Sequence, residues 1–411
     1  MKQLHRRVVV TGLGILSPIG NTVNEAWSSC TQGLSGITNV DVGITNSPVR
    51  IGAQLKNFNT SDYLDPKEVR RIDPFIQYGL IAANQSISDS GILEYESLNK
   101  EKVGINFGAG IGGIQTIENN KMVLESKGHK KVSPFFVPGS IVNMISGLVS
   151  IKHGFMGPNT SVVTACSTGN HCIGTAARSI ACGEADVMVA GGAEMASTPL
   201  SIAGFISARA LSTNSDPESA CRPWDKDRDG FVLADGAGSL VLEDYEHAKK
   251  RNAHIYAEII GFGMSSDAYH MTAPPEDGRG AALSMKNALI DAEINADEID
   301  YINAHGTSTP LGDLAETRAL KTIFTNTMPS ISSTKSMTGH TLGAAGAIES
   351  IFCIKSLNDN VVPPTINLIN QDSECDLDYT ALRSVEKKVT LAMNNSFGFG
   401  GTNSTLVFKK I

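Results

Sequence analysis

Short, uninterrupted runs of apolar residues recur along this chain. They lie at residues 8–14, 103–107, 187–192 and 239–242. Runs of this kind are typical of strands buried on both faces of a sheet. Longer segments with a helical pattern lie between them, for example at residues 75–89 and 281–292. Buried strands that alternate with helices predict an α/β architecture.

The chain also resembles a repeat of itself. Residues 170–177 are similar to residues 339–346. This offset of 169 residues places Lys335 opposite Cys166. Chance similarity is the alternative, because glycine and alanine are abundant in both segments.

Weaker internal similarities occur at other offsets. They relate residues 257–263 to 8–14, and residues 302–306 to 105–109. Unequal offsets are expected when two copies of one unit carry different insertions. We therefore predict two halves, residues 1–250 and 251–411, that meet after a charged stretch.

Composition narrows the function class. A chain of 411 residues with 41% hydrophobic residues can bury large cores, and its net charge of −8 disfavours nucleic acid as the main partner. No apolar run is long enough to span a bilayer, and the basic N-terminus lacks a signal-peptide core. Seven cysteines without a CxxC pair indicate reduced thiols, so we expect a cytoplasmic protein without a membrane partner.

Cys166 has the most informative surroundings of any residue. The apolar run at residues 161–164 predicts a buried strand that ends at Thr164, and a helical segment follows at residues 173–181. At such a turn backbone N–H groups converge and the helix dipole is positive, which lowers a thiol pKa and favours a nucleophile. On this segment alone, a buried structural cysteine is the alternative.

Three later segments resemble this one in placing polar residues after a predicted strand. Residues 303–313 hold His305 and two hydroxyls, residues 333–340 hold Lys335 and His340, and residues 394–403 form a glycine-rich turn. That turn can present several N–H donors to an anion. Any one segment could be an ordinary polar loop. Because sites of α/β sheets gather at the carboxyl ends of strands, the four turns together predict one site.

In combination, these turns resemble the β-ketoacyl-acyl-carrier-protein synthases, condensing enzymes of the thiolase superfamily. The matching motifs are residues 164–167, residues 305–309, Lys335 with residues 339–340, and residues 395–403. The resemblance covers essentially the whole chain. Residues 263–270 and 70–75 are similar to the subgroup that elongates fatty acyl chains. The family implies a duplicated thiolase-like fold, two mixed sheets with shared helices in five layers (αβαβα), and a homodimer.

The resemblance implies a decarboxylative Claisen condensation. Cys166 would take an acyl group from acyl carrier protein, and malonyl carrier protein would then condense with it and release carbon dioxide. The backbone N–H groups of Cys166 and Phe399 would hold the oxyanion. His305 and His340 would donate to the enolate oxygen, and Lys335 would tune the charge of this cluster. No cofactor is expected, because the substrates arrive on the phosphopantetheine of the carrier.

Further roles come from the same resemblance. Thr307 and Thr309 would bind the phosphopantetheine arm, and Phe399 would block the site until Cys166 is acylated. Ile111 would line the acyl pocket and limit chain length, although it could equally be ordinary core. Glu349 could pair with Lys335. A structural cation is possible at Asn303, Glu349, Asn394 and Asn395.

Carrier docking needs a local basic patch, because both proteins are acidic. The candidates are Lys67, Arg70, Arg71 and Arg209. The first three are spaced i, i+3 and i+4 and are expected on one helix face, and Arg209 matches a docking position of the family. A solvated face paired with Asp65 and Glu68 is the alternative.

Several other interpretations compete with this one. Residues 108–113 fit a dinucleotide pattern but lack a clear βαβ unit, and residues 225–230 imitate a calcium loop in which Gly236 stands where glutamate is required. No histidine–cysteine spacing suggests zinc.

Rivals within the superfamily differ at single positions. A degradative thiolase would need a second cysteine in the closing loop, whereas the nearest C-terminal one is Cys375. An initiating synthase would pair one histidine with asparagine. A non-catalytic chain-length subunit would lack Cys166. A polyketide ketosynthase would carry the same catalytic residues, so that alternative stays open.

Overall fold

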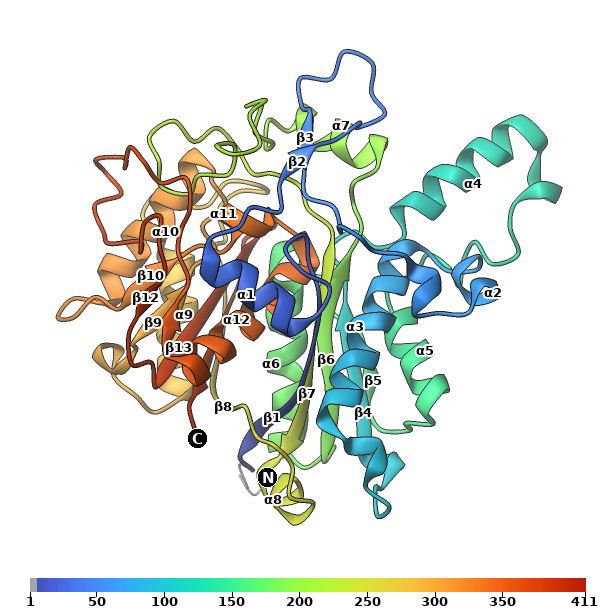
Figure 1. Cartoon of the computed structure of the whole chain (residues 1–411), viewed down its shortest axis with the longest axis horizontal. Helices are drawn as coiled ribbons and strands as arrows, with labels where there is room; N and C mark the ends of the chain where they lie inside the picture. Colours follow the sequence, from blue (N-terminus) through green and yellow to red (C-terminus); the bar gives the residue numbers. More distant parts are fainter. Residues whose placement is uncertain (1–5) are drawn as a thin grey trace.

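A ten-stranded mixed sheet organises the protein, and its strands follow the order β10-β9-β13-β14-β8-β1-β7-β6-β4-β5 (Figure 1). The computed structural model describes residues 6–411; residues 1–5, part of the basic N-terminal segment, lie outside it. One half of the sheet contains β1 (Val8–Leu16), β7 (Gly236–Asp244), β6 (Val187–Glu194), β4 (Val103–Gly108) and β5 (Asn159–Thr160). The other contains β8 (Ala257–Ser266), β14 (Thr402–Lys409), β13 (Leu391–Gly398), β9 (Tyr301–Asn303) and β10 (Ser330–Ser332). The four apolar runs at residues 8–14, 103–107, 187–192 and 239–242 therefore form strands as predicted.

The two halves repeat one pattern of pairing. In each half, reading outward from the centre, two antiparallel pairs are followed by two parallel pairs. The halves join where β1 pairs with β8 over three residue pairs, from Val8 with Ile259 to Val10 with Ala257. The boundary predicted at residue 250 falls in the connection between α8 (Tyr245–Lys250) and β8.

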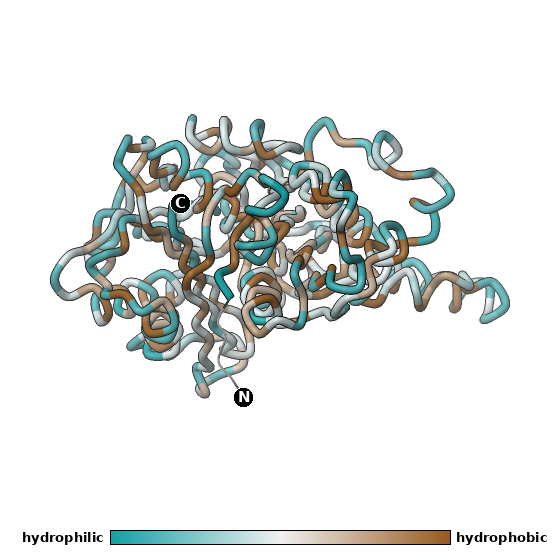
Figure 2. Tube along the Cα trace, turned by 90° about the horizontal axis from the view of Figure 1, so that it is seen from below, coloured by the Kyte–Doolittle hydropathy of each residue, from teal (hydrophilic) through white to brown (hydrophobic). Residues whose placement is uncertain are grey.

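Helices complete five layers. The helices α6 (Thr168–Ala181) and α12 (Ala345–Asp359) lie between the half-sheets. The helix α3 (Pro74–Ser90) covers the outer face of the first half, and α9 (Arg279–Asp291) with α10 (Pro310–Ile323) covers that of the second. Three buried apolar clusters fill the spaces between these layers, and Figure 2 shows hydrophobic segments concentrated inside. The predicted αβαβα fold is confirmed, except that its two expected sheets join through β1 and β8 into one.

The internal repeat has a different register from the predicted one. A short 3-10 turn precedes α6 at Ala165–Ser167 and precedes α12 at Leu342–Ala344, an offset of 177 residues. Ala165 and Leu342 both adopt positive φ, 48° and 46°. The predicted offset of 169 was wrong because it aligned residues inside α6 with the turn before α12. Gly343, not Lys335, is therefore the counterpart of Cys166.

The interface between α6 and α12 shows the same two-fold relation. A Cβ at Gly169 would lie 2.6 Å from the backbone nitrogen of Ala347, and one at Gly346 would lie 2.8 Å from that of Asn170. The two glycines are 177 residues apart, and so are the two residues that they meet. Glycine at both positions lets the helix backbones approach closely.

The strand predicted for residues 161–164 is wrong. β5 ends at Thr160, and Val163 is exposed. Here the chain leaves the edge of the sheet and crosses toward Cys166, and the Ser161 hydroxyl donates to the carbonyl of Phe107 at the end of β4. An apolar run beside an edge strand need not be buried.

One helix, α4 (Ile114–Lys127), projects from the body and has no buried residue (Figure 1). The remaining helices are α1 (Val23–Gln32), α2 (Pro66–Val69), α5 (Met144–His153), α7 (Pro199–Ser207) and α11 (Lys335–Thr338). The remaining strands are β2 (Thr38–Asn39), β3 (Ile51–Gly52), β11 (Val361–Val362) and β12 (Val385–Glu386). Among residues 6–411, no helix combines the length and apolar character needed to cross a membrane.

Candidate active site

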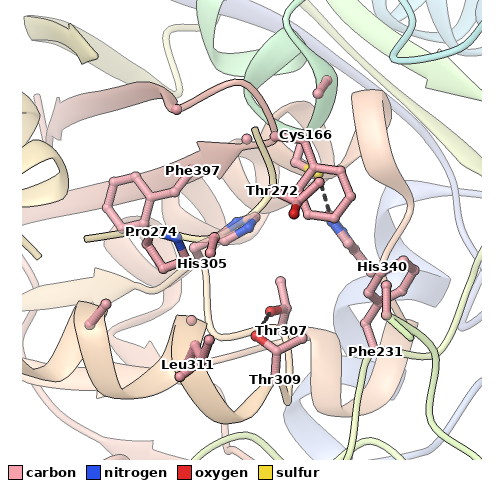
Figure 3. A pocket seen from close by; sticks show the side chains of 18 of the residues that line it. Cys166, Phe231, Thr272, Pro274, His305, Thr307, Thr309, Leu311, His340 and Phe397 are labelled. Carbon is pink, nitrogen blue, oxygen red and sulfur yellow. Dashed lines mark hydrogen bonds between the residues drawn. The ribbon is translucent and has the colours of Figure 1, made fainter. Parts of the chain in front are cut away.

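A cavity of about 660 Å³ brings the predicted turns together at the carboxyl ends of the parallel strands (Figure 3). Its lining includes Cys166 from the turn before α6, His305 after β9, His340 after α11 and Phe399 after β13. The nucleophile turn comes from the first half and the other three residues come from the second. The site is therefore complete only when both halves are folded together.

The Cys166 thiol lies deep in this cavity. Its Sγ is 3.0 Å from Nε2 of His340, and Figure 3 shows this contact as a dashed line. Burial raises the pKa of Cys166 to about 12, although Lys335 and the backbone N–H groups of Phe399 and Cys166 act to lower it. The expected lowering of the thiol pKa is therefore wrong, because desolvation outweighs the turn. The resting thiol is protonated and must lose its proton during attack.

His305 and His340 face each other across the cavity with ring centroids 5.4 Å apart. Burial lowers the pKa of both well below the usual value, and the positive charge of Lys335 lowers both further. Both imidazoles are therefore neutral near pH 7. A neutral imidazole can donate one hydrogen bond and accept another, as a site that handles an enolate requires.

The Lys335 ammonium forms a buried ion pair with the Glu349 carboxylate of α12. Lys335 is buried and does not line the cavity, but its charge acts on both histidines. Burial raises the pKa of Glu349 to about 7, against the lowering effect of Lys335. The pair places a positive charge near both imidazoles without exposing it to a substrate.

The other predicted lining residues also reach the cavity. The hydroxyls of Thr307 and Thr309 are 3.0 Å apart on its wall. Ile111 lines the cavity and is 40% exposed, so it is not ordinary core. Phe399 is 39% exposed in the glycine loop, where Gly400 and Gly401 adopt positive φ.

Three of the four residues considered for a structural cation fit one. Asn303 and Asn394 are register partners on β9 and β13, and the helix α12, which carries Glu349, packs against both strands. Their Asn303 Oδ1, Asn394 Oδ1 and Glu349 Oε2 atoms are buried without a hydrogen-bond partner. Such oxygens suit a hard cation, which would offset the Glu349 charge. Asn395 does not fit, because it lies on the opposite face, where its Oδ1 accepts from Thr405.

The proposed docking residues divide into two places. Arg209 is exposed and lines the cavity, whereas Lys67, Arg70 and Arg71 are exposed on and after α2. The predicted single helix face is wrong, because α2 ends at Val69 and Asp73, which precedes a proline, adopts an extended conformation. No ion pair in the described part of the chain joins these four side chains to Asp65 or Glu68.

Three buried or half-buried acids were missed by sequence reasoning. Glu316 accepts the N–H groups of His305 and Gly306 at 2.9 and 2.8 Å. Asp267 ties the glycine loop by accepting from Asn403 at 2.7 Å. Glu194 holds another loop of the cavity wall. Its position at the end of an apolar strand was the one signal that could have revealed it.

Two competing interpretations conflict with the geometry. The N–H groups at residues 110–112, which a dinucleotide phosphate would need, face the Glu194 carboxylate. Cys375, the candidate for a second thiolase cysteine, is buried in the outer core of the second half and does not line the cavity. An initiating synthase would pair one histidine with an asparagine, whereas two histidines, His305 and His340, lie beside Cys166 here.

A duplicated αβαβα fold with this Cys-His-His cluster defines a condensing enzyme of the thiolase type. Residues 5–248 match the N-terminal domain of β-ketoacyl synthases, and residues 256–369 match the C-terminal domain. The chain therefore belongs to the β-ketoacyl synthase family, whose members are acyltransferases that form carbon–carbon bonds.

Proteins with similar sequences match this chain over nearly its full length. The chain is 54% identical to a 3-oxoacyl-[acyl-carrier-protein] synthase 2 from Vibrio cholerae and to one from Coxiella burnetii, each over 99% of both chains. The Staphylococcus aureus synthase 2 is 48% identical over 99% of both chains.

Solved structures share the fold. A β-ketoacyl synthase from Burkholderia phymatum superposes with a TM-score of 0.92 at 36% identity, covering 99% of this chain and 100% of that one. A type II polyketide ketosynthase in complex with its acyl carrier protein gives 0.91 at 33% identity, covering 99% of both chains.

Proposed function

We propose that this chain is an elongating 3-oxoacyl-[acyl-carrier-protein] synthase of fatty acid biosynthesis. The observation that carries this proposal is the position of the Cys166 thiol, 3.0 Å from His340 and within one cavity with His305. The full-length identity to synthase 2 relatives favours fatty acid elongation over a polyketide pathway.

Acyl transfer is the first step of the proposed reaction. Cys166 Sγ attacks the thioester carbonyl of the acyl carrier protein, and the N–H groups of Cys166 and Phe399 bind the resulting oxyanion. The bond from the acyl carbon to the pantetheine sulfur breaks, and the Cys166 proton ends on that departing sulfur. His340 Nε2 is placed to relay this proton.

Decarboxylation and condensation follow. The malonyl carboxylate leaves as carbon dioxide, and its bonding electrons form an enolate on the thioester oxygen. Acyl-Cys166 no longer has a thiol hydrogen for Nε2 to accept, so neutral His340 can carry its single proton on Nε2. His340 and His305 then each donate a hydrogen bond to this oxygen. The enolate carbon attacks acyl-Cys166, the β-ketoacyl carrier forms, and the Cys166 thiolate takes a proton from solvent. These steps balance without a cofactor.

The remaining residues position the substrates in this proposal. Thr307 and Thr309 bind the phosphopantetheine arm, and Ile111 limits the acyl chain. Phe399 gates the site before acylation, and the positive φ of the two glycines that follow it supplies the backbone freedom for this movement.

Mass spectrometry of the intact protein and its peptides tests the function. After mixing with a medium-chain acyl carrier protein, we expect an acyl adduct on Cys166 that malonyl carrier protein discharges as a β-ketoacyl product. Discharge by CoA alone would indicate a thiolase reaction. With folded protein and a competent donor, the absence of any adduct would contradict the proposal.

Carrier docking is proposed at Arg209 and at the basic group formed by Lys67, Arg70 and Arg71. Charge reversal, such as Arg209→Glu, is expected to raise KM for acyl carrier protein roughly tenfold and to leave kcat nearly unchanged, because rim charges act on association. Lys226→Glu is the matched surface control. An Arg209→Glu enzyme with unchanged KM and unchanged salt dependence would exclude this position.

A homodimer is proposed from the exposed apolar side chains on and after α4. They are Ile117, Met122, Leu124, Phe135, Val137 and Ile141. Exposed apolar side chains on a projecting helix and the segment after it suit contact with a second copy of the chain. Sedimentation of the intact protein measures the oligomeric state, and a monomer at micromolar concentration would contradict the proposed dimer.

We propose that the enzyme acts in the cytoplasm, in keeping with its seven free cysteines.

A further inference from the structure

Glu194 is a fully buried carboxylate that the proposed chemistry does not use. It ends β6 and accepts four backbone N–H groups. These come from Gly110 at 2.6 Å, Ile111 at 3.1 Å, Gly112 at 3.1 Å and Gly343 at 3.1 Å. Among residues 6–411, no cationic side chain forms an ion pair with it. Only backbone dipoles offset its charge, and burial raises the pKa of Glu194 to about 7 against them.

The four donors belong to two separate segments of the chain. Residues 110–112 follow β4 in the first half, and Gly343 lies in the turn before α12 in the second. Each segment presents one large apolar side chain to the cavity, Ile111 from the first and Leu342 from the second. One carboxylate therefore fixes two parts of the cavity wall that are distant in the sequence.

Both segments are shaped to admit this carboxylate. A Cβ at Gly110 would lie 2.7 Å from Glu194 Oε2, and one at Gly343 would lie 2.9 Å from the same atom. Leu342 holds a positive φ of 46°, a strained conformation for a residue with a side chain. The hydrogen bond from the neighbouring Gly343 N–H helps to hold that turn in place.

We propose that Glu194 is a specificity-determining positioning residue. It holds the Ile111 loop and the Leu342 turn at a fixed separation and so sets the room available to the acyl chain. The inference deepens the proposed function and rests on it. In Glu194→Gln the new NH₂ group meets backbone donors wherever it is placed, because each carboxylate oxygen accepts at least two of the four N–H groups.

Chain-length selectivity is the measurement that tests this role. We would determine kcat/KM with a graded series of acyl carrier proteins for the wild type and Glu194→Gln. Burial of each methylene is worth enough for roughly tenfold discrimination per two-carbon step at the limit of a fixed pocket. In Glu194→Gln we expect the discrimination between acyl chains that differ by two carbons to fall to about threefold or less. Acyl-Cys166 should still form.

Asp235→Asn is the matched control. Asp235 is also buried and accepts two backbone N–H groups, those of Ala196 and Ser197, but it does not line the cavity. Both N–H groups donate to the same Oδ1, which asparagine keeps, so Asp235→Asn removes a buried acid away from the cavity and should leave the selectivity profile unchanged. If Glu194→Gln is too unstable to assay, Glu194→Asp keeps the charge with a shorter reach and should give an intermediate profile.

A double-mutant cycle with Ile111→Ala tests whether Glu194 acts by positioning Ile111 or by keeping the whole cavity wall ordered. If Glu194 acts through Ile111, Glu194→Gln should change selectivity much less in the Ile111→Ala background. An unchanged profile in folded Glu194→Gln, the same change in Asp235→Asn, or full additivity in the cycle would each overturn the inference. A wild type that never acylates Cys166 would instead refute the proposed function, so the two failures are distinguishable.

Discussion

Replacing either His305 or His340 with alanine is expected to slow decarboxylation of malonyl carrier protein by about 100- to 1,000-fold. Each histidine is proposed to donate one hydrogen bond to the enolate oxygen, and loss of one preorganised donor in a buried site has a cost of this size. Burial and Lys335 keep both imidazoles neutral, so the donated proton is the single N–H of a neutral ring.

Release of labelled carbon dioxide measures this step separately from condensation. Cys166→Ala is expected to abolish condensation and to retain decarboxylation, because the enolate does not need the thiol. His153→Ala is the control, since His153 lies on α5, away from the cavity, and contacts Asn84. If both active-site histidine variants released carbon dioxide at the wild-type rate, the enolate assignment would be wrong.

The pH dependence provides a further check on these histidines. Their pKa values are lowered well below 6.5, so protonation does not remove the neutral form as pH falls from 8 to 6.5. Decarboxylation by the wild type should therefore show no loss in that interval that is assignable to imidazole protonation.

Replacing Lys335 with methionine is expected to destabilise the folded protein by about 3–5 kcal/mol. The substitution would leave Glu349 buried without its ion-pair partner, and an uncompensated buried charge has a cost of this order. Lys335 is 1% exposed and Glu349 is 2% exposed, so water cannot compensate the loss. The histidine pKa values should also rise, because the Lys335 charge lowers both.

Urea unfolding compares this variant with two others. Lys335→Met combined with Glu349→Gln should recover much of the lost stability, because neither position of the pair then carries a charge. Lys121→Met removes one partner of an exposed pair and should change stability by less than about 1 kcal/mol. A Lys335→Met protein as stable as Lys121→Met would show that the buried pair contributes little.

Much of the fold followed from local patterns. The apolar runs near Val8 and Val187 became central strands because burial on both faces demands uninterrupted apolar residues. The four polar turns met in one cavity because parallel strands carry their carboxyl ends to the same edge. The resemblance supplied the roles of Cys166, His305 and His340, which local pattern alone left open.

What the sequence could not predict depends on contacts between distant residues. Glu194 looked like the polar end of an apolar strand, and its donors lie 82–84 and 149 residues away. The thiol pKa of Cys166 was misjudged because burial of the side chain outweighs the local dipole. The repeat register was misjudged because glycine and alanine match by chance more easily than the positive-φ turns that define it.

The two corresponding turns, Ala165–Ser167 and Leu342–Ala344, have different roles in the two halves. Cys166 carries the thiol, whereas its counterpart Gly343 has no room for any side chain, because a Cβ there would lie 2.2 Å from the backbone nitrogen of Gly110. The space that a second nucleophile would need is filled by the wall of the first one's pocket. Although the two halves share one fold, only the first therefore carries a nucleophile at this position. The corresponding turn of the second half supports the wall of the cavity that this nucleophile uses.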